Sequence, residues 1–138
     1  SKAFFGQKDY QQLAVIRQLT TSLDLQIDIV GCPIIREEDG LAMSSRNALL
    51  SKEERPLASH IFKIIQAAKE LYPNISLSQT KSSVTAEISQ ITKMTLDYVE
   101  IAHATNLQPI TDKKEPAILC IAVFLGSVRL IDNILLNK

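Results

Sequence analysis

The sequence predicts an α/β to α+β fold, in which a strand–helix–strand unit precedes a small domain of helices and an antiparallel sheet. Near the N-terminus, a short apolar run ends at a glycine, apolar residues then recur at helical spacing, and a second short apolar run follows. Near the C-terminus, helical spacing gives way to a period of two and then to the continuous apolar run 118–125. With 138 residues, 46% of them hydrophobic, the chain is long enough for one domain of ordinary size.

The first unit is predicted to span residues 3–31. Residues 3–6 are typical of the end of a strand that turns at Gly6, and residues 26–30 predict a second strand. Between them, apolar residues at helical spacing predict a helix: Leu13, Ile16, Leu19 and Leu23. A helical crossover joins parallel strands, but one crossover cannot cover both faces of a parallel sheet. We therefore expect either the C-terminal portion of a larger α/β protein or a unit that reorganises or dimerises to cover its edges.

Residues 34–50 lack a regular period and predict a surface loop, with a domain boundary between 1–46 and 47–138. Ser51 and Glu54 match a capping box, which predicts the start of a helix, although Pro56 suggests an irregular first turn or a displaced cap. The expected helix ends near Pro73 and buries one apolar stripe: Leu57, Ile61, Ile64, Ile65, Ala68 and Leu71.

A second helix is predicted from the stripe Val84, Ile88, Ile91 and Met94, with Ser78 or Thr80 as its cap. The period then changes to two, which predicts a strand with Asp97, Val99 and Ile101 on one face. Residues 118–125 predict a central strand because the run is apolar throughout. Residues 128–134 predict a further strand, which pairs in the antiparallel sense because its connection is short.

Composition argues against two classes of partner. The 15 basic and 15 acidic residues give a formal net charge of zero, which is not the positive field of a nucleic-acid binder. The run 118–125 is too short to span a bilayer and the N-terminus lacks a signal pattern, so we expect no membrane contact and a cytoplasmic protein. Cys32 and Cys120 lack neighbours at metal-ligand spacing and are expected to be buried, reduced thiols.

The first candidate motif is the run from Gly6 to Gln12. Gly6 allows a ligand to approach the backbone, and Lys8 offers a cation near a helix start, where amide groups also favour anions. Asp9 can accept hydrogen bonds from ribose hydroxyls, and Gln12 can bind a hydroxylated substrate. The alternative interpretation is structural: Asp9 only caps the helix and Lys8 is solvated.

The second candidate motif is Met43-Ser44-Ser45-Arg46. Two hydroxyl groups and a guanidinium can hold phosphate oxygens, and Arg46 can bind the charge that builds on a departing pyrophosphate. Met43 supplies an adaptable apolar contact. Here too a structural alternative exists, in which the serines satisfy backbone groups of an ordinary polar loop.

Three runs together carry a resemblance to a known family: residues 5–13, residues 39–47 and the run from Phe124 to Asn133. They closely resemble the pantoate–β-alanine ligases, and the resemblance extends over the whole chain. It implies that the first unit is the remnant of a nucleotide-binding, Rossmann-like domain and that the small α+β domain is a lid. It also implies a two-step ligase: ATP activates the carboxylate of pantoate as an acyl adenylate, and the amine of β-alanine then displaces AMP.

The resemblance also implies the roles of individual residues. The ATP-binding residues would be Gly6, Gln7, Lys8, Asp9, Ile35, Met43, Ser44, Ser45 and Arg46. Of these, Lys8, Ser44, Ser45 and Arg46 would be catalytic, and Gln12 would bind pantoate. Residues 43–46 match a mobile loop that closes on the triphosphate and excludes water from the adenylate.

The family's first signature, a pair of histidines in the N-terminal domain, has no counterpart here, since His60 and His103 lie outside any suitable motif. We therefore expect a missing N-terminal domain and no activity of these residues alone, and the resemblance implies a homodimer as the full-length form. Mg²⁺ is implied for the full-length enzyme, but no ligand for it is identified in this chain. Two alternatives stay open: a non-catalytic folding or self-association module, and another adenylyl-transfer enzyme of the same superfamily.

Overall fold

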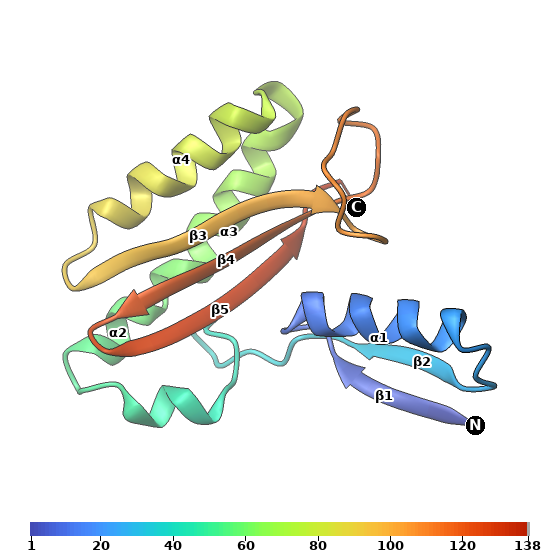
Figure 1. The fold of residues 1–138 in the computed structure, drawn as a ribbon. Coiled ribbons are helices and arrows are strands. Elements are labelled where there is room, and N and C mark those ends of the chain that lie inside the picture. The colour runs from blue at the N-terminus through green and yellow to red at the C-terminus, as the bar shows by residue number, and fades with distance from the viewer. Residues whose placement is uncertain (138) are drawn as a thin grey trace.

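The computed structural model describes residues 1–137 and consists of two parts. The N-terminal unit contains strand β1 (Lys2–Gly6), helix α1 (Tyr10–Ser22) and strand β2 (Asp28–Cys32). The two strands pair in parallel, from Lys2 opposite Asp28 to Gly6 opposite Cys32 (Figure 1). The predicted strand–helix–strand crossover is therefore confirmed, and its second strand begins at Asp28 rather than at Gln26.

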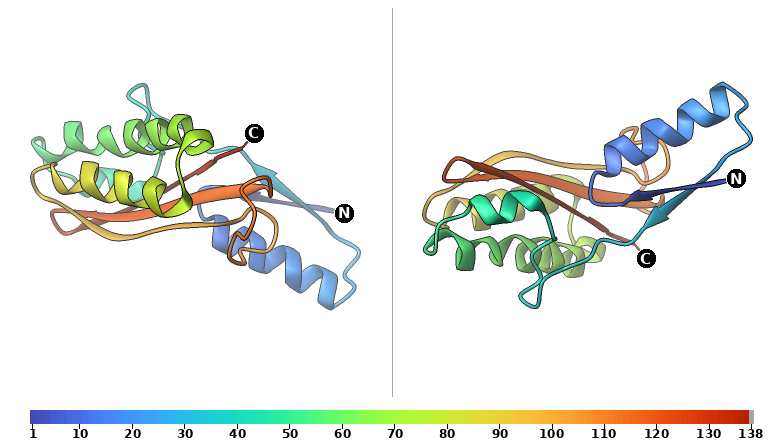
Figure 2. Two further views of the ribbon diagram at one scale, coloured as in Figure 1. Left: turned by 90° about the horizontal axis from the view of Figure 1, so that it is seen from above. Right: turned by 90° about the horizontal axis from the view of Figure 1, so that it is seen from below.

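The C-terminal part is an α+β unit whose sheet has the order β3-β4-β5. Its elements are the 3₁₀ helix η1 (Ser45–Leu49), helices α2 (Glu54–Ala58) and α3 (His60–Leu71), the 3₁₀ helix η2 (Tyr72–Asn74), helix α4 (Leu77–Ser89), and strands β3 (Met94–His103), β4 (Ala117–Leu125) and β5 (Val128–Leu135). Both strand pairs are antiparallel, and the apolar strand β4 is central, as predicted. Figure 2 shows α3 and α4 on one face of this sheet, while α1 lies on the other side.

The helix predicted from Ser51 to Pro73 is divided in two. The capping box is present, because the Glu54 amide donates to Ser51 Oγ and the Ser51 amide donates to Glu54 Oε1. Both the amide and the hydroxyl of Ser59 then donate to the Pro56 carbonyl oxygen, and this tight turn separates α2 from α3. Leu71 at the end of α3 is exposed, so its assignment to the buried stripe was wrong.

The cap and the end of α4 also differ from the prediction. Ser76 is the N-cap and forms a capping box with Gln79, whereas Ser78 lies inside the helix. Thr80 is buried and its hydroxyl donates to the Ser76 carbonyl oxygen. The helix ends at Ser89, so Met94 belongs to the first position of β3 although it packs in the same core.

A register shift in β3 changes the predicted position of Asp97. The pairing with β4 skips a residue between Leu96 and Tyr98, so Asp97 leaves the face that Val99 and Ile101 share. Asp97 is exposed and accepts a hydrogen bond from Arg129 Nε at 3.0 Å. The period of two alone cannot reveal such a bulge, because the extra residue shifts every side chain before it by one position.

The main hydrophobic core lies between the three-stranded sheet and helices α3 and α4. It extends back along the chain to Leu41, which is buried before the predicted boundary at residues 46 and 47. A smaller cluster on the other face joins Tyr10 of α1 to Ala104, Ile118 and Cys120. Several apolar side chains of the N-terminal unit are exposed, among them Phe4, Val15, Leu19 and Leu23. No helix within residues 1–137 is both long enough and apolar enough to cross a lipid bilayer.

Both cysteines are free thiols, as predicted. Cys120 is buried in β4, and this burial raises its pKa from 9.0 to about 11. Cys32, at the end of β2, is only partly buried, so the prediction of a buried thiol was wrong for this residue.

Candidate functional site

The two predicted motifs meet at one pocket of about 240 Å³. Lys8 and Asp9 come from the loop between β1 and α1, and Ser44 and Arg46 come from the start of η1. Strand β5 completes the wall with Arg129, Leu130 and Ile131. Segments more than 80 residues apart in sequence, with Arg46 and Arg129 as examples, therefore surround the same space.

The first motif is held at the end of the parallel strand pair. The Gln7 amide donates to the Cys32 carbonyl oxygen at 2.8 Å, which continues the pairing beyond β1. Asp9 is the N-cap of α1, and its Oδ1 accepts the Gln12 amide at 3.2 Å. The capping role proposed as the structural alternative for Asp9 is thus present, while the same residue also lines the pocket.

The second motif follows a short antiparallel ribbon, residues 35–43. The Met43 amide donates to the Ile35 carbonyl oxygen at 2.9 Å, and the Glu37 amide donates to the Leu41 carbonyl oxygen at 2.8 Å. The ribbon turns at Gly40, whose φ of 92° lies in the left-handed region. A Cβ at Gly40 would also come within 2.6 Å of the Phe62 ring, so the turn requires a glycine here.

Lys8 connects the two motifs directly. Its Nζ donates to the carbonyl oxygens of Ala42 at 3.4 Å and of Met43 at 3.3 Å. Burial lowers the pKa of Lys8 below its ordinary value of 10.5, and the positive charges of Arg46 and Arg36 add to this effect, while Asp132 opposes it.

The pocket is suited to an anion. Three cationic side chains, Lys8, Arg46 and Arg129, line it with one carboxylate, that of Asp9, and Arg129 is also paired with Asp97 outside the pocket. Ser44 adds a hydroxyl, whose oxygen accepts the Arg46 amide at 3.2 Å and keeps its own hydrogen available for donation. Cations and hydroxyl donors together match the oxygens of a phosphate chain.

The remaining predicted site residues do not line this pocket: Gly6, Gln7, Gln12, Ile35, Met43 and Ser45. Gln12 and Ser45 are exposed, and the Ile35 side chain is 70% exposed. A Cβ added at Gly6 would meet no atom within 4 Å, so the space beside its backbone is open. Neither His60 nor His103 reaches the pocket.

Sequence reasoning missed the contribution of β5. The run that contains Arg129, Asp132 and Asn133 carries part of the family resemblance, but local spacing gives these residues no role. The alternation of residues along the strand could have indicated their position. Val128 and Leu130 pack in the main core from one face, and Arg129, Ile131 and Asn133 share the other. A buried aspartate among the core-facing positions also indicated a partner of opposite charge.

Residues 1–137 contain no group of three or more histidine, cysteine, aspartate or glutamate side chains placed to hold a metal ion. With Asp9 as the one carboxylate on the described pocket wall, these side chains do not form a metal site by themselves. Magnesium bound with a nucleotide takes most of its ligands from phosphate oxygens and water.

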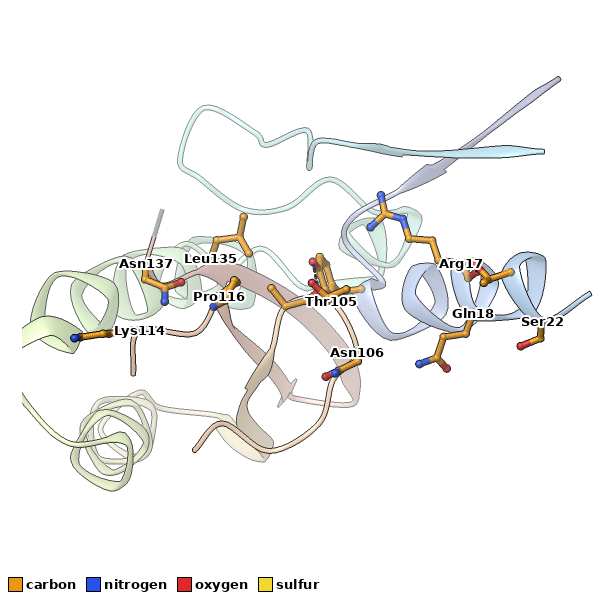
Figure 3. Close-up of a pocket in the computed structure, with 12 residues that line it drawn as sticks. Arg17, Gln18, Ser22, Thr105, Asn106, Lys114, Pro116, Leu135 and Asn137 are labelled. Carbon is orange, nitrogen blue, oxygen red and sulfur yellow. Dashed lines mark hydrogen bonds between the residues drawn. The ribbon is translucent and has the colours of Figure 1, made fainter. Parts of the chain in front are cut away.

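A larger cleft, of about 780 Å³, lies between α1 and the loop that follows β3. None of the predicted site residues lines it. Figure 3 shows Arg17 on α1 and Lys114 at opposite ends of this cleft, so their charges do not converge. The smaller pocket is therefore the better candidate for a site that binds an anion.

Comparison with known proteins gives a consistent result. A family model described as Pantoate-beta-alanine ligase matches residues 1–135. The chain is 46% identical over 134 residues to the pantothenate synthetase of Clostridioides difficile (strain 630). This match covers 96% of the chain and 48% of that protein. It is 43% identical over 138 residues to the pantothenate synthetase of Clostridium acetobutylicum, covering 99% of this chain and 49% of that protein.

Solved structures agree with this result. The pantothenate synthetase of Thermus thermophilus has a TM-score of 0.91 and 35% identity, over 99% of this chain and 50% of that one. A pantoate-beta-alanine ligase of Francisella tularensis, complexed with beta-gamma ATP and beta-alanine, has a TM-score of 0.67 and 26% identity, over 99% of this chain and 44% of that one. The chain thus spans about half the length of the relatives that it matches.

Proposed function

We propose, because the chain belongs to the pantoate–β-alanine ligase family, that it forms the C-terminal half of an ATP-dependent ligase that makes pantothenate. In the first step a carboxylate oxygen of pantoate attacks the α-phosphorus of ATP, and pyrophosphate leaves. In the second step the amine of β-alanine attacks the acyl carbon, an amide forms, and AMP leaves with the bonding electron pair. The adenylate makes the carboxylate reactive because AMP is a far better leaving group than oxide.

The observation that carries this proposal is the convergence of Lys8, Ser44 and Arg46 on one pocket. We assign Lys8 and Arg46 to the phosphate oxygens, where their charges oppose the negative charge that grows on the departing pyrophosphate. Ser44 and Ser45 would donate hydrogen bonds to the same oxygens. Such contacts accelerate the first step because they strengthen as that charge develops.

The other assigned residues would bind the rest of the substrates. Gly6 is the last residue of β1 and Asp9 caps α1, and an open backbone and a carboxylate at these positions would suit the ribose. Gln7, Ile35 and Met43 would complete the nucleotide site, with the backbone of Ile35 toward the adenine. Gln12, in the first turn of α1, would hydrogen-bond a hydroxyl of pantoate.

Magnesium bound to the triphosphate would neutralise part of its charge, and no residue of this chain is assigned as its protein ligand. The segment 43–46 would close over the triphosphate and exclude water from the adenylate, which hydrolyses readily. The partial exposure of Ser44 and the exposure of Ser45 and Arg46 support this, because a closing segment must be free to move.

We further propose that residues 1–46 belong to a nucleotide-binding, Rossmann-like domain and that residues 47–138 form its lid. The remaining half of the enzyme would provide most of the pantoate pocket, and the complete enzyme would be a homodimer. On this proposal, residues 1–138 alone do not make pantothenate. Exposed apolar side chains on the N-terminal unit, such as Phe4 and Val15, support the idea that further polypeptide covers it.

The test is to supply the missing half. The chain is joined to, or mixed with, the N-terminal half of the Clostridioides difficile relative, and AMP release is measured with ATP, pantoate and β-alanine. We expect AMP release that requires both pantoate and β-alanine and that Lys8→Ala strongly reduces. If the assembled protein binds its other half but releases no AMP, the chain is instead a non-catalytic folding or self-association module.

A further inference from the structure

The strand β5 contacts both motifs of the candidate site through two consecutive buried residues, Asp132 and Asn133. Polar side chains this deeply buried are costly unless every polar group is satisfied. Both oxygens of Asp132 and both hydrogens of the Asn133 side-chain amide have hydrogen-bond partners, and these partners belong to the segments that carry the two motifs.

Asn133 holds the first motif. Its side-chain Nδ2 donates hydrogen bonds to two main-chain carbonyl oxygens, that of Gln7 at 2.7 Å and that of Lys8 at 2.9 Å. A side-chain amide has two hydrogens, and this geometry uses both of them. The two bonded carbonyl groups lie before and after the Lys8 Cα. Asn133, which is 125 positions away in sequence, thereby fixes the main chain on both sides of Lys8.

Asp132 holds the second motif through Arg36. Its two oxygens accept from both terminal nitrogens of Arg36, at 2.7 and 2.9 Å. Arg36 also donates to the Gly40 carbonyl oxygen at 3.0 Å, and its guanidinium lies 3.8 Å from the centre of the Phe62 ring. The ribbon 35–43, which leads directly into Ser44, is thus fixed to β5 by an ion pair whose carboxylate is buried and whose guanidinium is partly buried.

Consecutive side chains of a strand point to opposite faces. Asp132 and Asn133 therefore reach the two motifs from the two sides of one strand, and that strand also places Arg129 in the pocket wall. We propose that Asp132 and Asn133 are positioning residues, which set the separation between Lys8 and the Ser44–Arg46 segment so that both contact one triphosphate. This inference rests on the proposed function.

The test separates positioning from mere stabilisation. Asn133→Asp keeps the size of the side chain but turns a carboxylate oxygen toward two carbonyl oxygens, and Asn133→Ala removes both hydrogen bonds. In the complete enzyme, well below the melting temperature of each variant, we expect kcat/KM for ATP in pyrophosphate release to fall at least 10-fold. The KM for β-alanine should change less than twofold.

Asn137 offers a matched control. Its Nδ2 also donates to main-chain carbonyl oxygens, those of Glu115 and Lys113, and its Oδ1 accepts the Ala117 amide, but it does not line the pocket that contains Lys8. Asn137→Ala should lower the melting temperature and leave kcat/KM for ATP unchanged.

The decisive comparison repeats Asn133→Ala in a Lys8→Ala background. If Asn133 acts by placing Lys8, its loss should cost little once Lys8 is gone, less than threefold in kcat/KM for ATP. An equal loss of kcat/KM for ATP in both backgrounds would overturn the inference. So would a value that Asn133→Ala leaves unchanged, and in either case the proposed function would stand. A wild-type protein that releases no pyrophosphate would remove the proposed function and the inference with it.

Discussion

The ammonium group of Lys8 donates a hydrogen bond to the main-chain carbonyl oxygen of Met43 at 3.3 Å. This contact joins the two motifs, which are 35 positions apart in sequence, directly before the serine pair. At 3.3 Å the bond is longer than the usual 2.9–3.0 Å for such donors, so a phosphate oxygen could replace it at little cost.

Removing the charge of Lys8 should slow the first chemical step. In the complete enzyme, Lys8→Ala should reduce pantoate-dependent pyrophosphate release by on the order of 100-fold, about 3 kcal/mol, which is typical for one contact to a developing anion. Lys2→Ala is the matched control, because Lys2 is an exposed lysine of β1 outside the pocket. Unchanged pyrophosphate release in Lys8→Ala would contradict the assignment.

The pH dependence of the same step should reflect the environment of Lys8. The protonated amine is the form that binds phosphate, and burial lowers its pKa below 10.5. The rate should therefore fall as pH rises through this lowered pKa, earlier than for an ordinary lysine. Lys8→Arg should move the alkaline fall to higher pH, because a guanidinium stays charged. The measurement is kcat/KM for ATP as a function of pH in wild type and Lys8→Arg. A fall at the same alkaline pH in both proteins would count against a role for the charge of Lys8.

Gln12 should affect the use of pantoate and not of ATP. Gln12→Ala leaves a substrate hydroxyl without its partner, so pantoate affinity should weaken by about 1–3 kcal/mol. Gln11→Ala is the natural comparison, since Gln11 is the preceding residue of α1 and is also exposed. Steady-state KM values for pantoate distinguish the two variants, and a normal value for Gln12→Ala would remove the residue from the site.

The sequence predicted the parallel strand–helix–strand unit, a central apolar strand and its antiparallel hairpin with the last strand, because period and glycine positions follow directly from local geometry. It failed where one residue changes the register or where a turn competes with a helix, as at Asp97 and Ser59. For the candidate site, it identified Lys8 and Arg46 on separate loops. It did not assign Arg129 or Asn133, because their roles depend on packing between distant segments rather than on local spacing.

Cys120 should make stability fall at alkaline pH. Its pKa is 9.0 as an ordinary thiol and about 11 in the folded protein, so the folded state holds the proton more tightly. This contribution is complete below pH 9 and is lost as pH rises from 9 to about 11, by up to roughly 2–3 kcal/mol. The free energies of unfolding in urea should be measured for wild type and Cys120→Ala across this pH range. The stability of wild type relative to the variant should fall by that amount. Parallel curves would contradict the shift.

The exposed apolar residues of α1 should cause these 138 residues to self-associate. Val15 and Leu19 are 60% and 53% exposed and lie one turn apart on the same helix face. Sedimentation velocity should show concentration-dependent association that Val15→Glu with Leu19→Lys abolishes. Leu71→Lys, a change at another exposed leucine, should have no effect. A strictly monomeric wild-type chain at high concentration would show that this face is protected in another way.

Lys8 and Arg46 are proposed to bind the same triphosphate. A crystal structure of the complete enzyme with a non-hydrolysable ATP analogue tests this directly. We predict that Lys8 Nζ and the Arg46 guanidinium each lie about 2.7–3.2 Å from oxygens of one phosphate chain. A triphosphate bound elsewhere, or one that contacts only one of these two side chains, would contradict the assignment of both residues to the ATP site.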